Sequence, residues 1–194
     1  MNFNLSDPAV LAIIGAVALV IVLAIVWVVV RQRNRRRSAE LQACFGTEYE
    51  LALREYGSRN KAEAALLDRV HRVNHMTLRP LSDVERERYL TEWEGIQARF
   101  IDHPRGAVTE ADEMINSLLR ARGYDGGNFD RRAADLSVHH YKLVEPYRRA
   151  NALVVRAGRN EATTEELRSA MILYRALAEE LLHTPAIITR SEAA

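Results

Sequence analysis

The chain opens with a long apolar run. The 22 residues Ala9–Val30 include no charged or polar side chain. As a helix they span about 33 Å at 1.5 Å per residue, which matches a bilayer hydrocarbon core of about 30 Å. A buried helix of a soluble domain would instead show an apolar stripe on one side. The pattern predicts a transmembrane helix over 9–30, with Trp27 at the level of the lipid headgroups.

A basic juxtamembrane segment, residues 31–37, follows at once and carries five arginines: Arg31, Arg33, Arg35, Arg36 and Arg37. Residues 1–8 contain no Lys or Arg, and no small-x-small site follows the run, so we do not expect a cleaved signal peptide. The positive-inside rule puts the short N-terminus 1–8 outside and the C-terminal part in the cytoplasm. We expect a single-pass inner (cytoplasmic) membrane protein whose arginines contact the bilayer surface. They act as a topology signal or, alternatively, bind anionic lipids.

The remainder, residues 38–183, has apolar positions at three- and four-residue spacing, which is typical of helices. No alternating run indicates a strand. We expect an all-α domain of about five to seven helices, packed as a bundle or an orthogonal array, and a flexible tail at 184–194. The predicted helices cover residues 38–56, 61–76, 82–102, 104–122, 130–136, 138–157 and 163–183.

Local signals place the ends of these helices. Capping boxes begin at Ser82 and Thr163, because a glutamate follows each by three residues. Gly123 is expected to end the helix that precedes it. Ser137 is expected to cap the helix that begins at residue 138, and Pro146 to kink or restart it.

Composition narrows the classes of partner. Five of the 27 basic residues are the juxtamembrane arginines and one of the 26 acidic residues is Asp7, so residues 38–194 carry 22 basic and 25 acidic side chains. This mildly acidic balance argues against nucleic acid, which requires a basic face. Cys44 is the only cysteine, which excludes an internal disulfide and a four-thiolate metal site.

Candidate metal and catalytic motifs are incomplete. His71 and His75 are four residues apart, but the glutamate of a zinc-protease motif is absent. Glu180 and His183 form a single ExxH motif, whereas di-iron helical bundles need two. Ser137 lies near histidines without a nucleophile elbow. We therefore expect no metal, no cofactor and no catalytic residue.

One polar constellation remains on two of the predicted helices. Its arginines, tyrosines and glutamate could converge between the helices as structural ion pairs, which we favour, or could line an anion or ligand site. The candidate cluster consists of Glu145, Tyr147, Arg148, Tyr174 and Arg175.

Several short motifs resemble those of a bacterial family of membrane proteins, sometimes labelled secreted, for which no reaction is assigned. The resemblance covers nearly all of 40–183 and implies one N-terminal membrane segment followed by a helical domain. The chain departs from the family at Cys44, Thr47 and Tyr141. The matching motifs are Phe45-Gly46-x-Glu48-Tyr49, Leu78–Leu81, Gln97–Asp102, Arg122–Tyr124, Arg132–Val138, Ala162–Arg168 and Tyr174–Leu177.

These observations favour a protein that acts by binding rather than by catalysis. The leading expectation is a membrane-anchored helical domain that serves as a protein–protein interaction or scaffold module. The alternative is a ligand-binding or enzymatic helical domain that uses the Tyr/Arg/Glu cluster.

Overall fold

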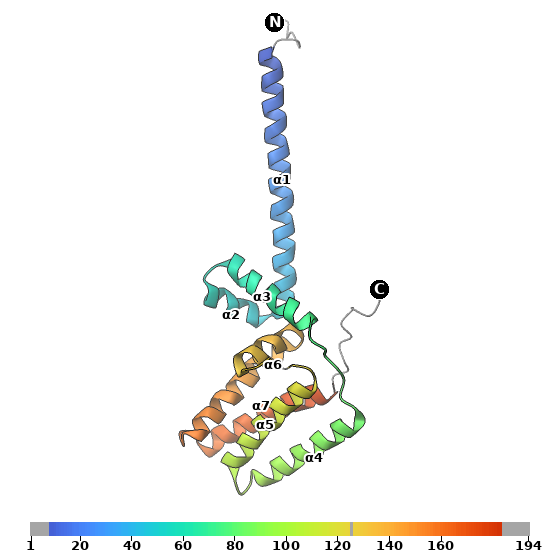
Figure 1. Cartoon of the computed structure of the whole chain (residues 1–194). Coiled ribbons are helices and arrows are strands. Elements are labelled where there is room, and N and C mark those ends of the chain that lie inside the picture. Colours follow the sequence, from blue (N-terminus) through green and yellow to red (C-terminus); the bar gives the residue numbers. More distant parts are fainter. Residues whose placement is uncertain (1–7, 125, 184–194) are drawn as a thin grey trace. The chain divides into compact units, whose positions relative to one another are not determined.

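The computed structural model describes residues 8–124 and 126–183, with the backbone alone for 8–16 and 18. This part of the chain contains seven α-helices and no strand (Figure 1). The expected all-α class is therefore confirmed. The helices are α1 (Pro8–Phe45), α2 (Thr47–Tyr56), α3 (Arg59–Asn74), α4 (Asp83–Arg99), α5 (Pro104–Ala121), α6 (Phe129–Gly158) and α7 (Thr164–His183).

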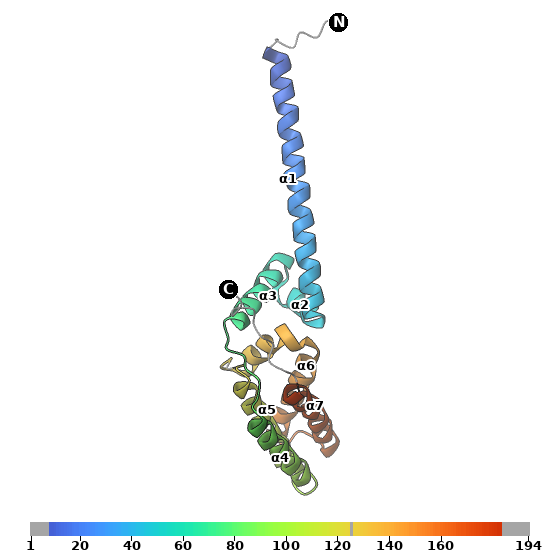
Figure 2. The ribbon, with the colours of Figure 1, turned by 90° about the vertical axis from the view of Figure 1, so that its right-hand side faces the viewer.

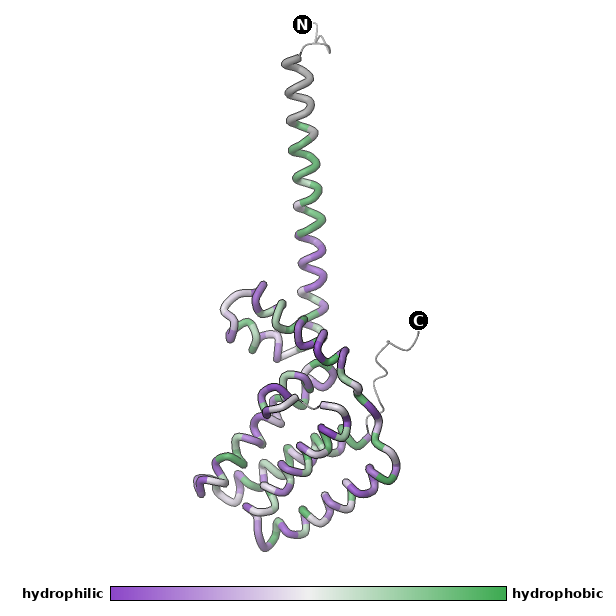
Figure 3. The backbone as a smooth tube through the Cα atoms, viewed as in Figure 1, coloured by the Kyte–Doolittle hydropathy of each residue, from purple (hydrophilic) through white to green (hydrophobic). Residues whose placement is uncertain are grey.

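The chain divides into two units, residues 1–43 and residues 44–194. The described part of the first unit is α1 as far as residue 43, and the apolar turns of this helix pass directly into polar ones (Figure 3). A search of the described residues finds no helix that is both long enough and apolar enough to cross a membrane. The predicted span 9–30 includes residues 9–16 and 18, whose side chains lie outside the described set. Residues 1–7 and the predicted tail, 184–194, also lie outside it.

The expected single helix over 38–56 is wrong, because it is divided at Gly46 between α1 and α2. Gly46 has φ +50°, a conformation that side chains with a Cβ rarely adopt. A Cβ on Gly46 would also lie only 2.5 Å from the ring of Tyr141. A glycine is therefore required here for two reasons, and the helix ends at Phe45.

The second unit contains two helical layers that share α6. Helices α5, α6 and α7 pack on one another, and α5 lies between α4 and α7 (Figures 1 and 2). The α2–α3 hairpin packs against α6. The largest fully buried side chains include four tyrosines, so much of the core is aromatic with a polar tip. These tyrosines are Tyr89, Tyr124, Tyr147 and Tyr174.

Three predicted helix ends are confirmed by their hydrogen bonds. Ser82 and Glu85 exchange the two bonds of a capping box, and Thr163 and Glu166 do the same at α7. At the end of α5, Gly123 has φ +97°, and the N–H groups of residues 123 and 124 donate to the carbonyls of residues 120 and 119. This is the Schellman pattern that favours glycine.

Helix α6 departs from the prediction in the position of its break. The non-helical residue is His140, with φ −132° and ψ 48°, whereas Pro146 keeps a helical conformation. Ser137 is not an N-cap, because its hydroxyl lies inside the helix and donates to the carbonyl of Ala134. The expected short helix and its successor are thus one long helix with a kink at His140. The Cys44 thiol lies 3.8 Å from the carbonyl of Val138, close to this kink.

Candidate functional site

The five arginines after the apolar run surround α1. At about 100° per residue, Arg31 and Arg35 lie on one side of the helix, and the other three lie on the opposite side. We call this group the arginine ring; it consists of Arg31, Arg33, Arg35, Arg36 and Arg37. All five side chains are exposed. Positive charge is therefore presented on all sides of the helix within about 9 Å along its axis.

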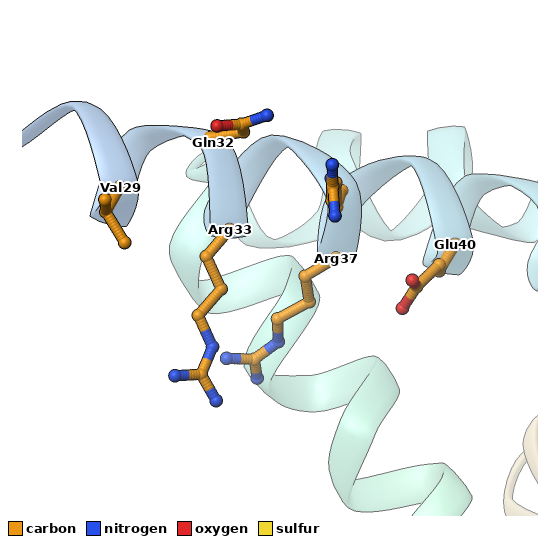
Figure 4. A pocket seen from close by; sticks show the side chains of 6 residues that line it. Val29, Gln32, Arg33, Arg37 and Glu40 are labelled. Carbon is orange, nitrogen blue, oxygen red and sulfur yellow. The ribbon is translucent and has the colours of Figure 1, made fainter.

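Two shallow hollows lie on opposite sides of the arginine ring. The larger has a volume of about 620 Å³, and Figure 4 shows Arg33 and Arg37 extending from the same side of α1 within it. It is lined by Val29, Gln32, Arg33, Arg36, Arg37 and Glu40. The smaller, of about 450 Å³, is lined by Trp27, Val28, Arg31, Gln32 and Arg35. Each hollow has apolar side chains towards the apolar run and guanidinium groups on the other side.

In the smaller hollow, one arginine already has an aromatic partner. The guanidinium carbon of Arg31 lies 4.9 Å from the centroid of the Trp27 ring. A cation over an indole face is attracted by the ring quadrupole, by about 0.5–1 kcal/mol at an exposed site. Arg31 thus packs towards the apolar run, as long cationic side chains do at an apolar boundary.

In the helical unit, α5, α6 and α7 share a polar network in the core. The Tyr174 hydroxyl donates to Asp112 Oδ1 at 2.5 Å, and the Tyr147 hydroxyl donates to Asn116 Oδ1 at 2.8 Å. Asn116 Nδ2 donates in turn to Asp112 Oδ2 at 2.9 Å, and Arg132 Nη2 reaches Asn116 Oδ1. Burial, followed by the Asp112 charge, raises the pKa of Tyr174, and burial also raises the pKa of Tyr147. Both phenols are therefore fixed as neutral hydrogen-bond donors.

The five residues of the predicted polar cluster do not converge. Tyr147 and Tyr174 join the α5 network just described, whereas Arg148 contacts both oxygens of Glu48 at 3.3 Å. Arg175 is exposed and pairs with Glu179 one turn along its own helix, at 2.7 Å. Glu145 is exposed as well. On a helix, residues adjacent in sequence point in different directions, which is why neighbours such as Tyr147 and Arg148 serve separate contacts.

Two buried carboxylates hold α2, α3 and α6 together. Glu48, 5% exposed, lies between Arg148 of α6 and Arg69 of α3, with an Arg69 distance of 3.6 Å. Asp135, fully buried, pairs with Arg72 of α3 at 2.8 Å. Such pairs orient helices, because removal of one partner leaves a buried charge without compensation. Sequence reasoning missed these three ion pairs, because their members are 21, 63 and 100 residues apart and no periodic pattern marks them.

The histidines do not assemble a metal site. The exposed rings of His71 and His75 stack with centroids 5.4 Å apart. His183 Nδ1 lies 2.7 Å from the carbonyl of Glu179, and His140 Nδ1 lies 3.6 Å from Glu180. Among the residues described, no three His, Cys, Asp or Glu side chains are placed to hold a metal ion. The expectation that the protein needs no metal remains a prediction.

Comparison with known proteins does not assign the chain to a group. No protein-family model matches it, and neither the curated proteins nor the solved structures compared with it give a significant match. The resemblance to a bacterial membrane-protein family therefore remains a prediction. The proposals that follow rest on the residues and contacts described above.

Proposed function

We propose that this protein is a single-pass membrane protein whose helical unit binds another protein. The observation that carries the proposal is the continuity of α1, which runs from Pro8 to Phe45 through the apolar run and the arginine ring. Its large apolar side chains from Val17 to Val30 are each 51–65% exposed. An exposed apolar surface of this extent is costly in water and is favourable in lipid.

The distribution of these side chains around α1 favours a helix that crosses the bilayer. A helix that lies in the membrane surface has one apolar and one charged face. In α1 the described part of the apolar run covers all sides, and the arginine ring also surrounds the axis. A band of cations about 9 Å deep on all sides of the helix fits a helix that crosses a layer of headgroups. The ring then lies on the cytoplasmic side by the positive-inside rule.

Two measurements test this anchorage and its direction. Alkaline carbonate should leave the full-length chain in the membrane pellet. Cys44, the only thiol, is exposed. A membrane-impermeant maleimide should therefore label it only after cells are lysed. Labelling in intact cells would place the helical unit on the opposite side, and extraction by carbonate would refute the anchor.

The interior of the helical unit favours binding at its surface over chemistry within it. The tyrosines of the predicted cluster are occupied by Asp112 and Asn116, and Arg148 is occupied by Glu48. These contacts occupy polar groups that the alternative, a ligand or catalytic site built from the cluster, would need. The surface therefore becomes the more favourable place for recognition.

The outer side of α4 provides such a surface. It carries a shallow hollow of about 720 Å³, which we call the α4 hollow, lined by Asp83, Val84, Glu87, Arg88, Thr91 and Glu92. Val84, in the first turn of α4, is 80% exposed. Asp83 pairs with Arg86 at 2.8 Å, and the Arg88 guanidinium lies over the Tyr89 ring at 4.6 Å. The carboxylates of Glu87 and Glu92 then dominate the charge of the α4 hollow. This favours a partner protein that presents a basic segment with an apolar anchor.

A photo-crosslinking experiment tests the α4 hollow. A photoreactive residue at Val84 of the full-length chain in membranes should give one discrete protein adduct. The same residue at Ile172, 62% exposed on α7, should not give it. Charge reversal in the hollow with Glu87→Lys and Glu92→Lys should remove the adduct. The control variant, Glu50→Lys with Glu55→Lys at exposed positions of α2, should still give the adduct. An adduct that survives reversal in the hollow would refute this docking site.

A further inference from the structure

We infer that the larger hollow of α1 binds one anionic phospholipid whose headgroup carries hydrogen-bond donors beyond its phosphate. The inference rests on the proposed membrane anchorage and identifies the lipid that the arginine ring selects. It starts from the order of side chains along one side of α1, shown in Figure 4: first Val29, then the guanidinium groups, then Glu40.

The guanidinium groups of this hollow suit a phosphate. Arg33, Arg36 and Arg37 lie within four residues, hence within about 6 Å along the helix axis. Guanidinium groups bind phosphate oxygens with paired N–H donors and keep their charge at all physiological pH values. Three of them together with the single carboxylate of Glu40 leave a positive balance, which favours an anionic lipid over a zwitterionic one.

The two ends of the hollow determine the orientation of the lipid. Val29 lies on the side of the apolar run, where an acyl chain would pack against it. Glu40 lies one turn beyond Arg36, and its ionised carboxylate only accepts hydrogen bonds. It therefore repels a second phosphate and favours hydroxyl or ammonium groups at the far end of the headgroup. The acyl chain of the lipid then lies beside Val29 and its phosphate beside the arginines. The hydrogen-bond donor of its headgroup lies beside Glu40.

The smaller hollow, on the opposite side of α1, is less suited to bind such a lipid. It offers two arginines, and one of them, Arg31, is stacked on Trp27 at 4.9 Å. The described residues that line that hollow include no carboxylate, so it lacks the acceptor-only group with which Glu40 would favour a headgroup that carries hydrogen-bond donors. This difference between the two sides makes the inference specific to three of the five arginines.

The test uses the full-length protein in nanodiscs of phosphatidylcholine with a minor fraction of phosphatidylglycerol. Native mass spectrometry of the released protein counts the lipids it retains. We expect one phosphatidylglycerol per chain. The variant Arg33→Gln, Arg36→Gln, Arg37→Gln should weaken this retention by roughly 100-fold, at about fivefold per arginine. Arg131→Gln, Arg149→Gln, Arg159→Gln, which removes three exposed arginines of the helical unit, should leave retention unchanged.

A second probe examines the role of Glu40. Phosphatidylmethanol carries the same charge as phosphatidylglycerol but has no hydroxyl beyond its phosphate. The native chain should prefer phosphatidylglycerol to phosphatidylmethanol. The Glu40→Ala variant should bind both lipids without this preference. A purely electrostatic surface would bind the two lipids equally in the native chain, which would overturn the headgroup assignment.

The remaining outcomes separate this inference from the anchorage on which it rests. If the triple arginine variant stays in the carbonate pellet and still retains phosphatidylglycerol as the control does, the lipid site is wrong and the anchor stands. If the native chain is extracted by carbonate, the anchor fails and the lipid site fails with it. Displacement of the lipid by added inorganic phosphate would show a site for a soluble anion instead.

Discussion

Tyr174 connects α7 to the polar network of α5. It is fully buried, and its hydroxyl donates to a carboxylate oxygen of Asp112 at 2.5 Å. A hydrogen bond to a charged acceptor is stronger than one between neutral groups. The same carboxylate accepts from Asn116. Loss of the Tyr174 hydroxyl would therefore leave Oδ1 of this half-buried carboxylate with only the longer hydrogen bond from Asn151, at 3.4 Å.

Replacement of this tyrosine by phenylalanine tests that contact. We expect Tyr174→Phe to lower the free energy of unfolding by about 2 kcal/mol, because it removes a charge-assisted bond and keeps the ring. Chemical denaturation of the helical unit measures the change. Tyr56→Phe, at a ring that is 39% exposed, is the control and should change stability little. Equal effects of the two substitutions would show that the Asp112 contact contributes nothing.

Gly123, like Gly46, is a residue whose identity the backbone demands. Its φ of +97° lies in the region that favours glycine, and a Cβ there would collide with the carbonyl oxygen of Thr77. We expect Gly123→Ala to destabilise the helical unit by about 1–3 kcal/mol. Gly158→Ala, at the end of α6 with no neighbour within 4 Å, should be neutral or slightly stabilising. Thermal unfolding of the two variants side by side distinguishes a specific demand for glycine from a general effect of alanine.

At the scale of elements, two histidines lie at the kink of α6: His140 is buried and His139 is half-buried. The ring nitrogens Nε2 of His139 and His140 are both buried and have no hydrogen-bond partner among the residues described. Burial lowers the pKa of both imidazoles; for His140, the charges of His139 and Arg122 add to this effect and that of Glu180 opposes it. The folded chain therefore prefers the neutral rings.

The sign of the resulting pH dependence follows from linkage. Because the folded pKa values lie below the ordinary value of 6.5, the unfolded chain binds protons first as the pH falls. The stability that these rings provide is complete above pH 6.5 and is lost below it. We expect His139→Gln with His140→Gln to flatten the fall in unfolding free energy between about pH 7 and about pH 5. His71→Gln with His75→Gln, both exposed, should retain the native slope.

For the molecule as a whole, the main apolar cluster of the described residues lies within the second unit. The main apolar cluster contains only residues between Leu81 and Leu182. The ion pairs of Glu48 and Asp135 also lie within residues 44–183. We expect a fragment of residues 44–194 to unfold cooperatively and to remain helical by circular dichroism. A fragment without a cooperative transition would show that α1 is part of the folding unit.

Much of the local structure could be predicted from the sequence. Helices α3, α4, α5 and α7 begin and end within two or three residues of the predicted positions. Their signals are local, because a capping box, a proline in the first turn or a glycine after the last turn acts on hydrogen bonds a few residues away. The division at Gly46 and the kink at His140 were not predicted. Each depends on groups distant in sequence, such as Tyr141 beside Gly46.

The candidate sites also have features that depend on neighbouring residues and features that depend on residues distant in sequence. The order of residues is enough to predict the helical class, most helix ends, the apolar run and the arginine ring, since hydropathy, charge and capping are properties of neighbouring residues. It does not predict that Tyr174 reaches Asp112, that Arg148 reaches Glu48 or that Asp135 is buried with Arg72, which became known from the packed helices. These contacts join separate helices, and the rotation of each helix about its own axis is set by packing rather than by any pattern within it.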